Sequence, residues 1–380
     1  MNKRIKYICY YDKQDAKIKR NYVLAATNKL DYIFKALNAK GIGVDIVSCS
    51  GCIETKWVYS RKKKIVDGLN ILHLFASWGC YDNAFFRVLD RWFLHLQFLI
   101  WILLHVKKDE EIVVYHSLGY VNLLLLAKKI KRFRIIGEIE EIYQDVSSYP
   151  ISKCRAEYAF IEKCEKYIFP TSLLNDKLNN KGKPFLLIHG TYQVEPDRGG
   201  YFDDGKIHVV YAGTFDPNKG AAAAAAAAAF LPENYHLHIL GFGNKRDTEA
   251  ILKVIKDTTR IAPCTLTYDG LLKGEEYIRF IQKCQIGLST QNPDAAFNAT
   301  SFPSKILSYM ANGLRVVSIR IKAIEESSVG QEISYYDCQT PEEIAKAIVR
   351  VDLSESYDSR ETIEDLNRSF SSQLSLFLYS

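Results

Sequence analysis

Residues 207–220 read IHVVYAGTFDPNKG, and this stretch decides the fold. A run rich in β-branched and aromatic residues leads to Gly213, and Lys219 and Gly220 close the polar turn that follows. The pattern predicts a buried strand, a tight turn and the start of a helix. Backbone N–H groups and the helix dipole favour a phosphate at such a turn, although an ordinary strand–turn–helix joint has the same pattern. A Walker A motif is excluded, because it has a longer glycine loop and a Ser or Thr after the lysine.

The same alternation of strands and helices continues on both sides of this stretch. After it, strands are expected at HLHILGFG, CTLTYDGLL, QIGLST and RVVSI, with helical patterns between them. Before it, the first half of the chain has strands at 4–11 and 44–50 and further strands at NILHLFA, EIVVYHS and RIIGEIEE. Strands separated by helices predict parallel sheets, so the fold class is α/β with two Rossmann-like domains.

A polar segment rich in Gly, Pro and Asp, 193–206, is the expected linker between the two domains. The domains are then 1–192 and 207–354, and the tail 355–380 is expected to be a helix that packs back on the first domain. Ligands of open α/β sheets bind at the carboxyl ends of the strands. We therefore expect the chemistry at strand ends, in a cleft between the two domains.

Composition excludes several classes of protein. The 380 residues carry a formal charge of +6 without a dense basic block, so no nucleic-acid partner is expected. The nine cysteines are scattered and no signal peptide is evident, which together favour a cytoplasmic protein. The most apolar run, 92–106, is shorter than a membrane span requires. It is interpreted as a buried helix, with a helix that touches the membrane surface as the alternative.

A second lysine stands at a helix start in NATSFPSKILSYMANGLRVVS, 298–318. Pro303 suits a first helical turn, Ser304 suits a cap, and Lys305 follows it. With Lys219 and Lys305 each at a strand-to-helix turn of one sheet, a clamp for a diphosphate is predicted. Two further strand ends are candidates for nucleoside contacts. One contains Gly241 and Gly243, and the other contains Leu271.

In the first half, two strand ends carry candidate groups. His116 ends one strand, where a structural role is the alternative to a catalytic one. Glu138, Glu140 and Glu141 end the next, and strand alternation places Glu138 and Glu140 on one face. Clustered carboxylates at a cleft serve hydroxyl-rich or cationic ligands, whereas a solvated acidic turn is the alternative.

These motifs resemble those of GT-B glycosyltransferases, and family 4 most closely. VVYAGTFDPNKG is similar to the family's loop ending in Lys-Gly, and SFPSKILSYMANGLRVVS is similar to its Pro-Ser-Lys signature. The resemblance implies a retaining transferase of bacterial surface polysaccharide (capsule or O-antigen) synthesis, with a UDP-sugar donor, a glycan or lipid-linked glycan acceptor, and neither cofactor nor metal. It implies sugar or acceptor contacts at His116, Glu140 and Glu141. It implies donor contacts at Gly213, Thr214, Lys219, Gly241, Gly243, Leu271, Ser301, Ser304, Lys305 and Ser308.

Two departures from the family pattern leave alternatives open. Thr214 stands where relatives often have arginine, and Thr300 and Ser308 stand where the signature has glutamates. A non-catalytic partner of another glycosyltransferase, with a degenerate donor site, is therefore the second hypothesis, and a sugar epimerase of the same fold is a third. The nine alanines 221–229 supply helix propensity but no large apolar side chains, and we interpret them as stand-ins for other residues, with an engineered substitution as the alternative. No site residue is assigned there.

Overall fold

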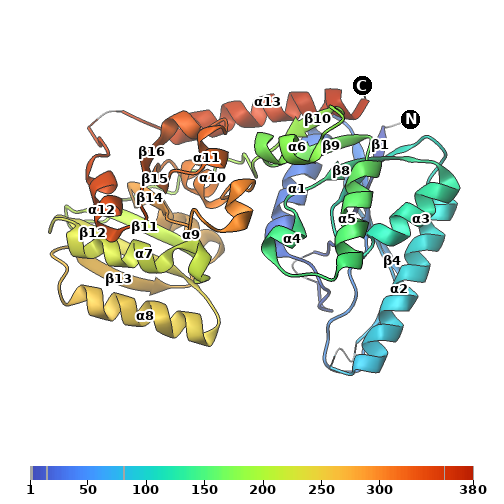
Figure 1. Ribbon diagram of the computed structural model, residues 1–380, viewed down its shortest axis with the longest axis horizontal. Coiled ribbons are helices and arrows are strands. Elements are labelled where there is room, and N and C mark those ends of the chain that lie inside the picture. Colours follow the sequence, from blue (N-terminus) through green and yellow to red (C-terminus); the bar gives the residue numbers. More distant parts are fainter. Residues whose placement is uncertain (1–2, 14–15, 80–81, 355, 380) are drawn as a thin grey trace. The chain divides into compact units, whose positions relative to one another are not determined.

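The computed structural model of the chain describes residues 3–13, 16–79, 82–354 and 356–379. The contacts divide the chain into two compact units (Figure 1). Unit 1 consists of Met1–Pro170, Leu174–Ile188 and Ser371–Ser380, and unit 2 consists of Thr171–Leu173 and His189–Phe370. Each unit has its own sheet flanked by helices, so the two expected α/β folds are confirmed.

Unit 1 is built on a sheet with the strand order β10-β9-β8-β7-β1-β2-β5-β4. Every neighbouring pair in it is parallel except β4 and β5, which pair antiparallel at the edge. A short antiparallel pair, β3 with β6, lies outside this sheet. The elements are β1 (Arg4–Cys9), α1 (Leu24–Ala39), β2 (Gly43–Ser48), β3 (Tyr59–Ser60), β4 (Lys63–Asp67), β5 (Asn70–Leu74), β6 (Ser77–Trp78), α2 (Ala84–His105), β7 (Glu111–Tyr115), α3 (Val121–Lys131), β8 (Arg134–Glu138), α4 (Tyr143–Val146), α5 (Ile151–Lys163), β9 (Lys166–Phe169), α6 (Ser172–Leu178) and β10 (Phe185–Leu187).

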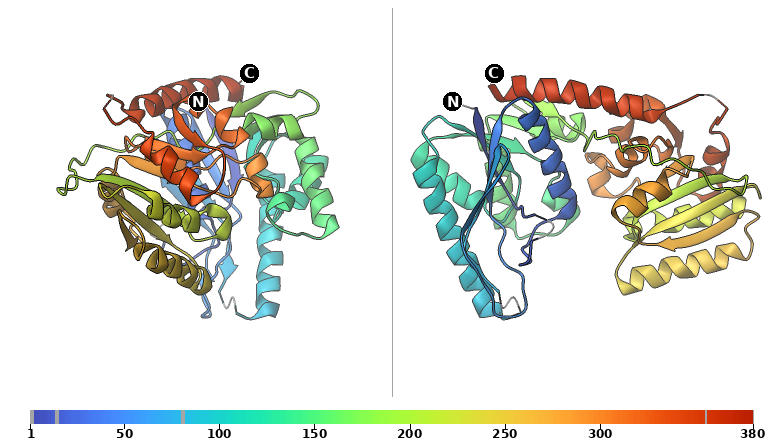
Figure 2. Two further views of the ribbon diagram at one scale, coloured as in Figure 1. Left: turned by 60° about the vertical axis from the view of Figure 1, so that its left-hand side comes forward. Right: turned by 180° about the vertical axis from the view of Figure 1, so that it is seen from behind.

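The helices of unit 1 cover both faces of its sheet. Helix α1 lies on one face and helices α2 and α3 lie on the other, as the right-hand view of Figure 2 shows. The core on the second face joins Phe98 and Trp101 of α2 to Leu124 of α3 and to strand residues such as Val114, and each of these is at most 4% exposed. A central parallel strand is buried on both faces, which is why β1 and β7 appear in the sequence as continuous apolar runs.

Unit 2 has a fully parallel sheet with the order β13-β12-β11-β14-β15-β16. Its elements are β11 (Ile207–Thr214), η1 (Pro217–Lys219), α7 (Ala221–Ala226), η2 (Ala227–Phe230), β12 (Tyr235–Phe242), α8 (Lys245–Thr259), β13 (Thr265–Gly270), α9 (Gly274–Ile281), β14 (Ile286–Ser289), η3 (Ala296–Ala299), α10 (Lys305–Met310), β15 (Arg315–Ile319), α11 (Lys322–Glu325), η4 (Gly330–Glu332), β16 (Ile333–Tyr336) and α12 (Pro341–Val349). The alanine tract forms α7 and most of η2, and it buries Ala221, Ala224, Ala225, Ala227 and Ala228.

The unit boundaries differ from the expected domain boundaries at residues 171–173, around the expected linker and in the tail. The expected linker 193–206 has no helix or strand, yet it belongs to unit 2. It is held there by backbone N–H groups, because Glu195 donates to Ala311 O at 3.0 Å and Arg198 donates to Gln282 Oε1 at 2.8 Å. The tail forms helix α13 (Ser359–Tyr379), whose residues from Ser371 onward belong to unit 1.

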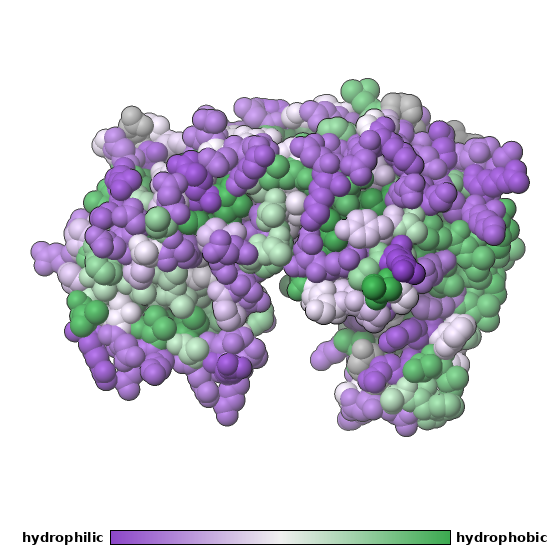
Figure 3. All heavy atoms as spheres, in the orientation of Figure 1, coloured by the Kyte–Doolittle hydropathy of each residue, from purple (hydrophilic) through white to green (hydrophobic). Residues whose placement is uncertain are grey.

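Helix α2 is longer than the apolar run that predicts it, and it is buried on one face only. It begins at Ala84, eight residues before the predicted start at Trp92. The side chain of Asn83 caps it by accepting from Phe85 N and Phe86 N. Its outer face exposes Phe85, Val88, Leu89, Trp92, Leu96, Ile100 and Leu104. By length and composition alone, the helix could also cross a membrane. Apolar surface accordingly gathers along the side of unit 1 where α2 and α3 lie (Figure 3).

Candidate functional site

The carboxyl ends of β11 and β12 bring two of the predicted glycines together. Gly213 pairs with Gly241 in the parallel register, so the two backbones lie side by side where both strands end. Gly241 has a φ of 148°, and a Cβ on it would collide with the carbonyl oxygen of Gly213. Only glycine fits there. The two strand ends therefore pack backbone against backbone, and Gly213 lies next to the ammonium nitrogen of Lys305.

The loop after Gly213 presents Lys219. Asp216 caps the one-turn helix η1 by accepting from Asn218 N at 2.7 Å. Gly220 has a φ of 81°, and a Cβ there would collide with the carbonyl oxygen of Thr290, so this position also requires glycine. Lys219 itself lies with its Nζ 4.5 Å from the centre of the Phe297 ring.

Lys305 is the most unusual group in unit 2. Its ammonium nitrogen is buried and has no hydrogen-bond partner among the described residues. It lies 4.0 Å from the centre of the Tyr211 ring, and a Cβ on Gly213 would be 3.1 Å from it. Burial, and then the charge of Lys219, lowers the pKa of Lys305 to about 7. A buried ammonium without a counter-charge is costly, so the surroundings of Lys305 favour an anionic ligand.

The remaining residues predicted for the donor site are spread more widely. Thr214 and Leu271 are exposed at the ends of β11 and just beyond β13, and Gly243 and Ser301 are half-buried. The expected cap at Ser304 is wrong, because this exposed side chain makes no capping hydrogen bond to α10. Ser308 lies inside α10 instead, where its hydroxyl is 3.3 Å from the Tyr277 hydroxyl.

In unit 1, a lysine that sequence reasoning missed organises the acidic strand end. Lys29 of α1 forms ion pairs with Glu140 and, at 3.7 Å, with Glu138 Oε1. This places both carboxylates on the same side, as strand alternation predicts. Glu138 is fully buried and accepts from the Tyr7 hydroxyl. Burial raises the pKa of Glu138 to about 7, even though Lys29 opposes the shift.

His116 lies in the core of unit 1. It is 2% exposed, its ring stacks on Phe160 at 5.7 Å, and its Nε2 lies 3.5 Å from Glu157 Oε1 on α5. Burial lowers the pKa of His116 to about 4, so the ring is neutral at physiological pH. The backbone of Glu141 hydrogen-bonds to this ring. The placement favours the structural role that the sequence left open for His116.

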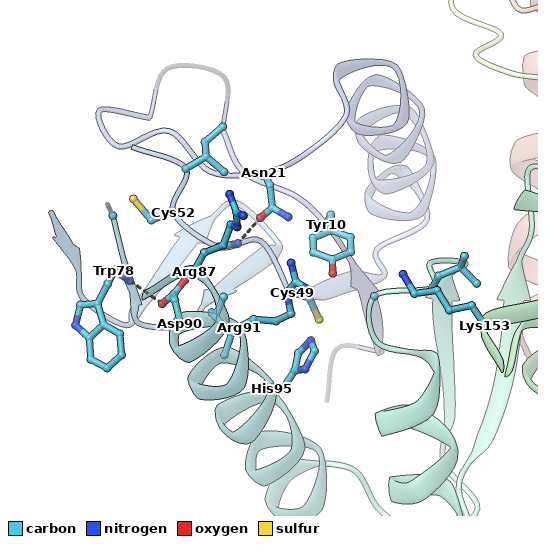
Figure 4. Close-up of a pocket in the computed structure, with 16 residues that line it drawn as sticks. Tyr10, Asn21, Cys49, Cys52, Trp78, Arg87, Asp90, Arg91, His95 and Lys153 are labelled. Atoms are coloured by element: carbon cyan, nitrogen blue, oxygen red, sulfur yellow. Dashed lines mark hydrogen bonds between the residues drawn. The ribbon is translucent and has the colours of Figure 1, made fainter. Parts of the chain in front are cut away.

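A pocket of about 420 Å³ in unit 1 is lined by basic side chains (Figure 4). Arg87, Arg91 and His95 come from successive turns of α2, and Lys153 comes from α5. Asp90, the acidic residue of this lining, is already engaged: it accepts from Ser77 Oγ at 2.8 Å and from Trp78 N at 2.7 Å. Arg91 forms no ion pair with any residue in the described part of the chain. The pocket is therefore suited to an anionic ligand.

Comparison with known families finds a match within the second unit. Residues 206–352 match the family described as "Glycosyl transferases group 1". This range contains both lysines and the strand ends at Gly213 and Gly241. No curated protein matches the chain.

Solved structures confirm the fold over the whole chain. Sucrose-phosphate synthase from Thermosynechococcus elongatus has a TM-score of 0.69 at 16% identity, with 100% of both chains covered. An α,α-trehalose-phosphate synthase (UDP-forming) from Burkholderia xenovorans, in complex with glucose-6-phosphate, has a TM-score of 0.64 at 12% identity, again with 100% of both covered. An E. coli structure described as trehalose-6-phosphate bound with UDP-2-fluoro glucose has a TM-score of 0.63 at 13% identity, covering 99% of this chain and 98% of that one. The chain thus has a GT-B fold, within which residues 206–352 match the group 1 glycosyltransferases, whereas membership in family 4 stays a prediction.

Proposed function

We propose that the protein is a retaining glycosyltransferase that moves a hexosyl unit from a UDP-sugar to a hydroxyl group of a glycan acceptor. The observation that carries the proposal is the buried ammonium of Lys305 beside Gly213, which no described residue neutralises. The diphosphate of a nucleotide sugar supplies two negative charges next to this buried amine, and these charges favour its protonated form. Lys219, whose charge contributes to the lowered pKa of Lys305, is the second cation for the same diphosphate.

In the proposed reaction, the bond between the anomeric carbon and the diphosphate oxygen breaks while the acceptor hydroxyl attacks from the same face. The departing phosphate oxygen takes the proton of that hydroxyl. Negative charge grows on the diphosphate in the transition state, and Lys219 and Lys305 stabilise it through electrostatic contacts that exist before the reaction begins. The protein otherwise contributes position, and Glu140, held by Lys29, orients sugar or acceptor hydroxyls. No metal ion is needed in this scheme.

Uridine is the base that two similar structures favour. One is named UDP-forming and another is described as bound with UDP-2-fluoro glucose. Ser308 replaces the ribose-binding glutamate of the family signature, and its hydroxyl lies beside the Tyr277 hydroxyl. We propose that this neutral pair contacts the ribose in place of a carboxylate, at the cost of a charge-assisted hydrogen bond worth about 1.5–3 kcal/mol.

The acceptor is proposed to be a phosphate-bearing, lipid-linked glycan of surface polysaccharide synthesis. The pocket with Arg87, Arg91 and Lys153 suits a phosphate group, and the similar Burkholderia structure holds glucose-6-phosphate. The exposed apolar side chains of α2 lie on the helix that also carries two of these pocket residues. A helix of this kind lies in the plane of a membrane surface, so we place the protein in the cytoplasm at the inner face of the membrane.

A panel of nucleotides tests the proposal. The melting temperature of the full chain is measured with UDP, GDP, ADP, TDP and CMP at millimolar concentration. UDP at 100 times its dissociation constant stabilises the folded protein by about 2.7 kcal/mol, which is readily detected. A selective shift with UDP is expected. The absence of any shift would refute donor binding and leave the non-catalytic partner as the better hypothesis, since Thr300 and Ser308 replace two carboxylates of the family.

A further inference from the structure

Three histidines of unit 2 come together towards the amino ends of two neighbouring strands, β11 and β12, whereas the proposed donor site lies at their carboxyl ends. His208 is the second residue of β11, and His236 and His238 lie near the start of β12. Gly213 and Gly241 lie at the other ends of these two strands. His208 pairs with His236 in the strand register, and alternation places His238 on the same face. One ring nitrogen from each histidine lies within 4.8 Å of one from each of the others.

Two carboxylates fix where the protons of this cluster lie. Asp204 Oδ1 is 2.8 Å from His208 Nε2, and Asp269 Oδ2 is 3.1 Å from His238 Nδ1. A carboxylate only accepts, so both of these ring nitrogens carry hydrogen. In neutral rings the other two nitrogens, His208 Nδ1 and His238 Nε2, are then without hydrogen, yet they face each other at 2.9 Å. Two lone pairs repel at this distance unless a cation lies between them.

The third histidine favours a metal ion over a proton as that cation. The Thr267 hydroxyl donates to Asp269 Oδ2 at 2.9 Å, so its oxygen accepts from His236 Nε2 at 3.1 Å. His236 Nδ1 is therefore also without hydrogen, and it lies 4.0 Å from Asp204 Oδ2. A proton can bridge one pair of nitrogens, whereas a metal ion can bind three nitrogens together.

The surroundings of the cluster exclude water from most of it. His208 and His238 are 1% and 2% exposed. The Phe202 ring stacks on both, with ring centres 4.1 Å and 5.1 Å apart. His236 is the most accessible of the three, with a side chain that is 16% exposed. The cluster is thus closed on one side and open on the side of His236 and Asp204.

We propose that His208, His236 and His238 form a structural Zn²⁺ site, with Asp204 and Asp269 as the carboxylates that orient two of the ligands. Neutral imidazole is a preferred ligand of zinc, and carboxylate–histidine–zinc arrangements are common around such sites. Tetrahedral coordination with Zn–N bonds of about 2.0–2.1 Å requires ligand nitrogens about 3.3 Å apart, so small side-chain adjustments suffice. The fourth ligand is Asp204 Oδ2 or water. The ion would join the 202–204 segment to β11 and β12.

Metal analysis of the full-length chain, purified without a histidine tag, tests this site. About one zinc per chain is expected after dialysis against micromolar Zn²⁺, and Co²⁺ in its place should give the visible absorption of tetrahedral cobalt. His236→Gln removes the most accessible ligand and should weaken zinc binding by at least about 10-fold. Asp269→Asn keeps all three ligands and should weaken it by about 10–100-fold. His73→Gln is the matched control, because His73 also faces a carboxylate, that of Asp45, but lies in unit 1.

Each outcome decides the proposal, and none depends on glycosyl transfer. Circular dichroism in the presence of a chelator establishes that each variant folds. Wild-type protein that binds neither Zn²⁺ nor Co²⁺ would show that a shared proton bridges the imidazoles, and the proposal would be overturned. Zinc binding that is equal in wild type, His236→Gln and Asp269→Asn would place the metal elsewhere and overturn it too. Loss in these two variants with retention in His73→Gln is the supporting result.

Discussion

Replacing Lys305 with methionine is expected to stabilise the ligand-free protein while weakening nucleotide binding. Methionine keeps an unbranched side chain of similar length next to the Tyr211 ring but carries no charge. Burial and Lys219 lower the pKa of Lys305 from 10.5 to about 7. At about 1.4 kcal/mol per pKa unit, the charged form costs the folded state at most about 5 kcal/mol. Because the surroundings relax, we expect a gain in unfolding free energy of about 1–3 kcal/mol in the variant.

The gain in unfolding free energy from Lys305→Met should decrease as the pH rises above 7. Below pH 7 the lysine is charged in both the folded and the unfolded state, so its full cost is present. Between pH 7 and 10.5 the unfolded state binds more protons than the folded state, so wild-type stability rises and the advantage of Lys305→Met shrinks. Thermal unfolding without ligand at pH 6.5 and pH 9 measures both values.

Although Lys305→Met should stabilise the free protein, it should weaken the binding of UDP. Loss of one charge-assisted contact, worth about 1.5–3 kcal/mol, should raise the dissociation constant about 10- to 150-fold in isothermal titration. Lys322→Met is the control, because its side chain is 68% exposed and forms an ion pair with Glu326 at the surface, so both stability and affinity should stay close to wild type. A Lys305→Met protein that is less stable than wild type and binds UDP equally well would refute the reasoning.

Three further predictions concern unit 1. Burial raises the pKa of Glu138 to about 7, so between pH 4.5 and 7 the folded state holds a proton that the unfolded state has lost. Glu138→Gln should therefore stabilise the protein more at pH 8 than at pH 5 in thermal unfolding. An equal effect at both pH values would contradict this. With the proposed donor site filled by saturating UDP, Arg91→Gln should weaken the binding of inorganic phosphate about 10-fold in isothermal titration, whereas the exposed Arg155→Gln should not; equal affinities would remove the pocket as an anion site. Trp92→Asp should reduce binding to vesicles of anionic phospholipid about 10-fold or more in a sedimentation assay, with Leu252→Asp of α8 as the control, and unchanged binding would exclude α2 as the membrane surface.

The central parallel strands were predictable because a strand that is buried on both faces has a continuous run of apolar residues in the sequence. Strands β1, β7 and β11 appear in this way. The antiparallel edge strand β4 could not be recognised, because most of its residues are exposed and it has no apolar run. The pair β3 and β6 has two residues in each strand, too few for any periodic pattern.

Candidate site residues could be predicted where they belong to a local sequence pattern, but not where they depend on contacts between distant parts of the chain. Glycine turns and the lysines that follow them are local patterns, so Gly213, Lys219 and Lys305 could be selected from the sequence. Lys29 could not, because its ion pair with Glu140 joins residues 111 positions apart. Arg91 was missed for a different reason: the apolar run begins at Trp92, so the amphipathic first turns of α2 were left out of the expected helix.

The histidine cluster shows what strand alternation can and cannot reveal. His236 and His238 are two positions apart, which alone places both on one face of β12. That His208 joins them depends on the pairing of β11 with β12, and the two lone pairs that face each other depend on Asp204 and Asp269. Neither the pairing partner nor the direction of a hydrogen bond is encoded in local spacing.

Proton uptake on UDP binding tests the central claim most directly, namely that the diphosphate binds against the buried ammonium of Lys305. Isothermal titration at pH 8 in two buffers of different ionisation enthalpy gives the number of protons taken up per UDP. Lys305, with its pKa near 7, is mostly neutral in the free protein at this pH, and a bound diphosphate would restore its charge. The account predicts an uptake of more than about half a proton in wild type and far less in Lys305→Met. UDP binding without proton uptake in wild type would contradict it.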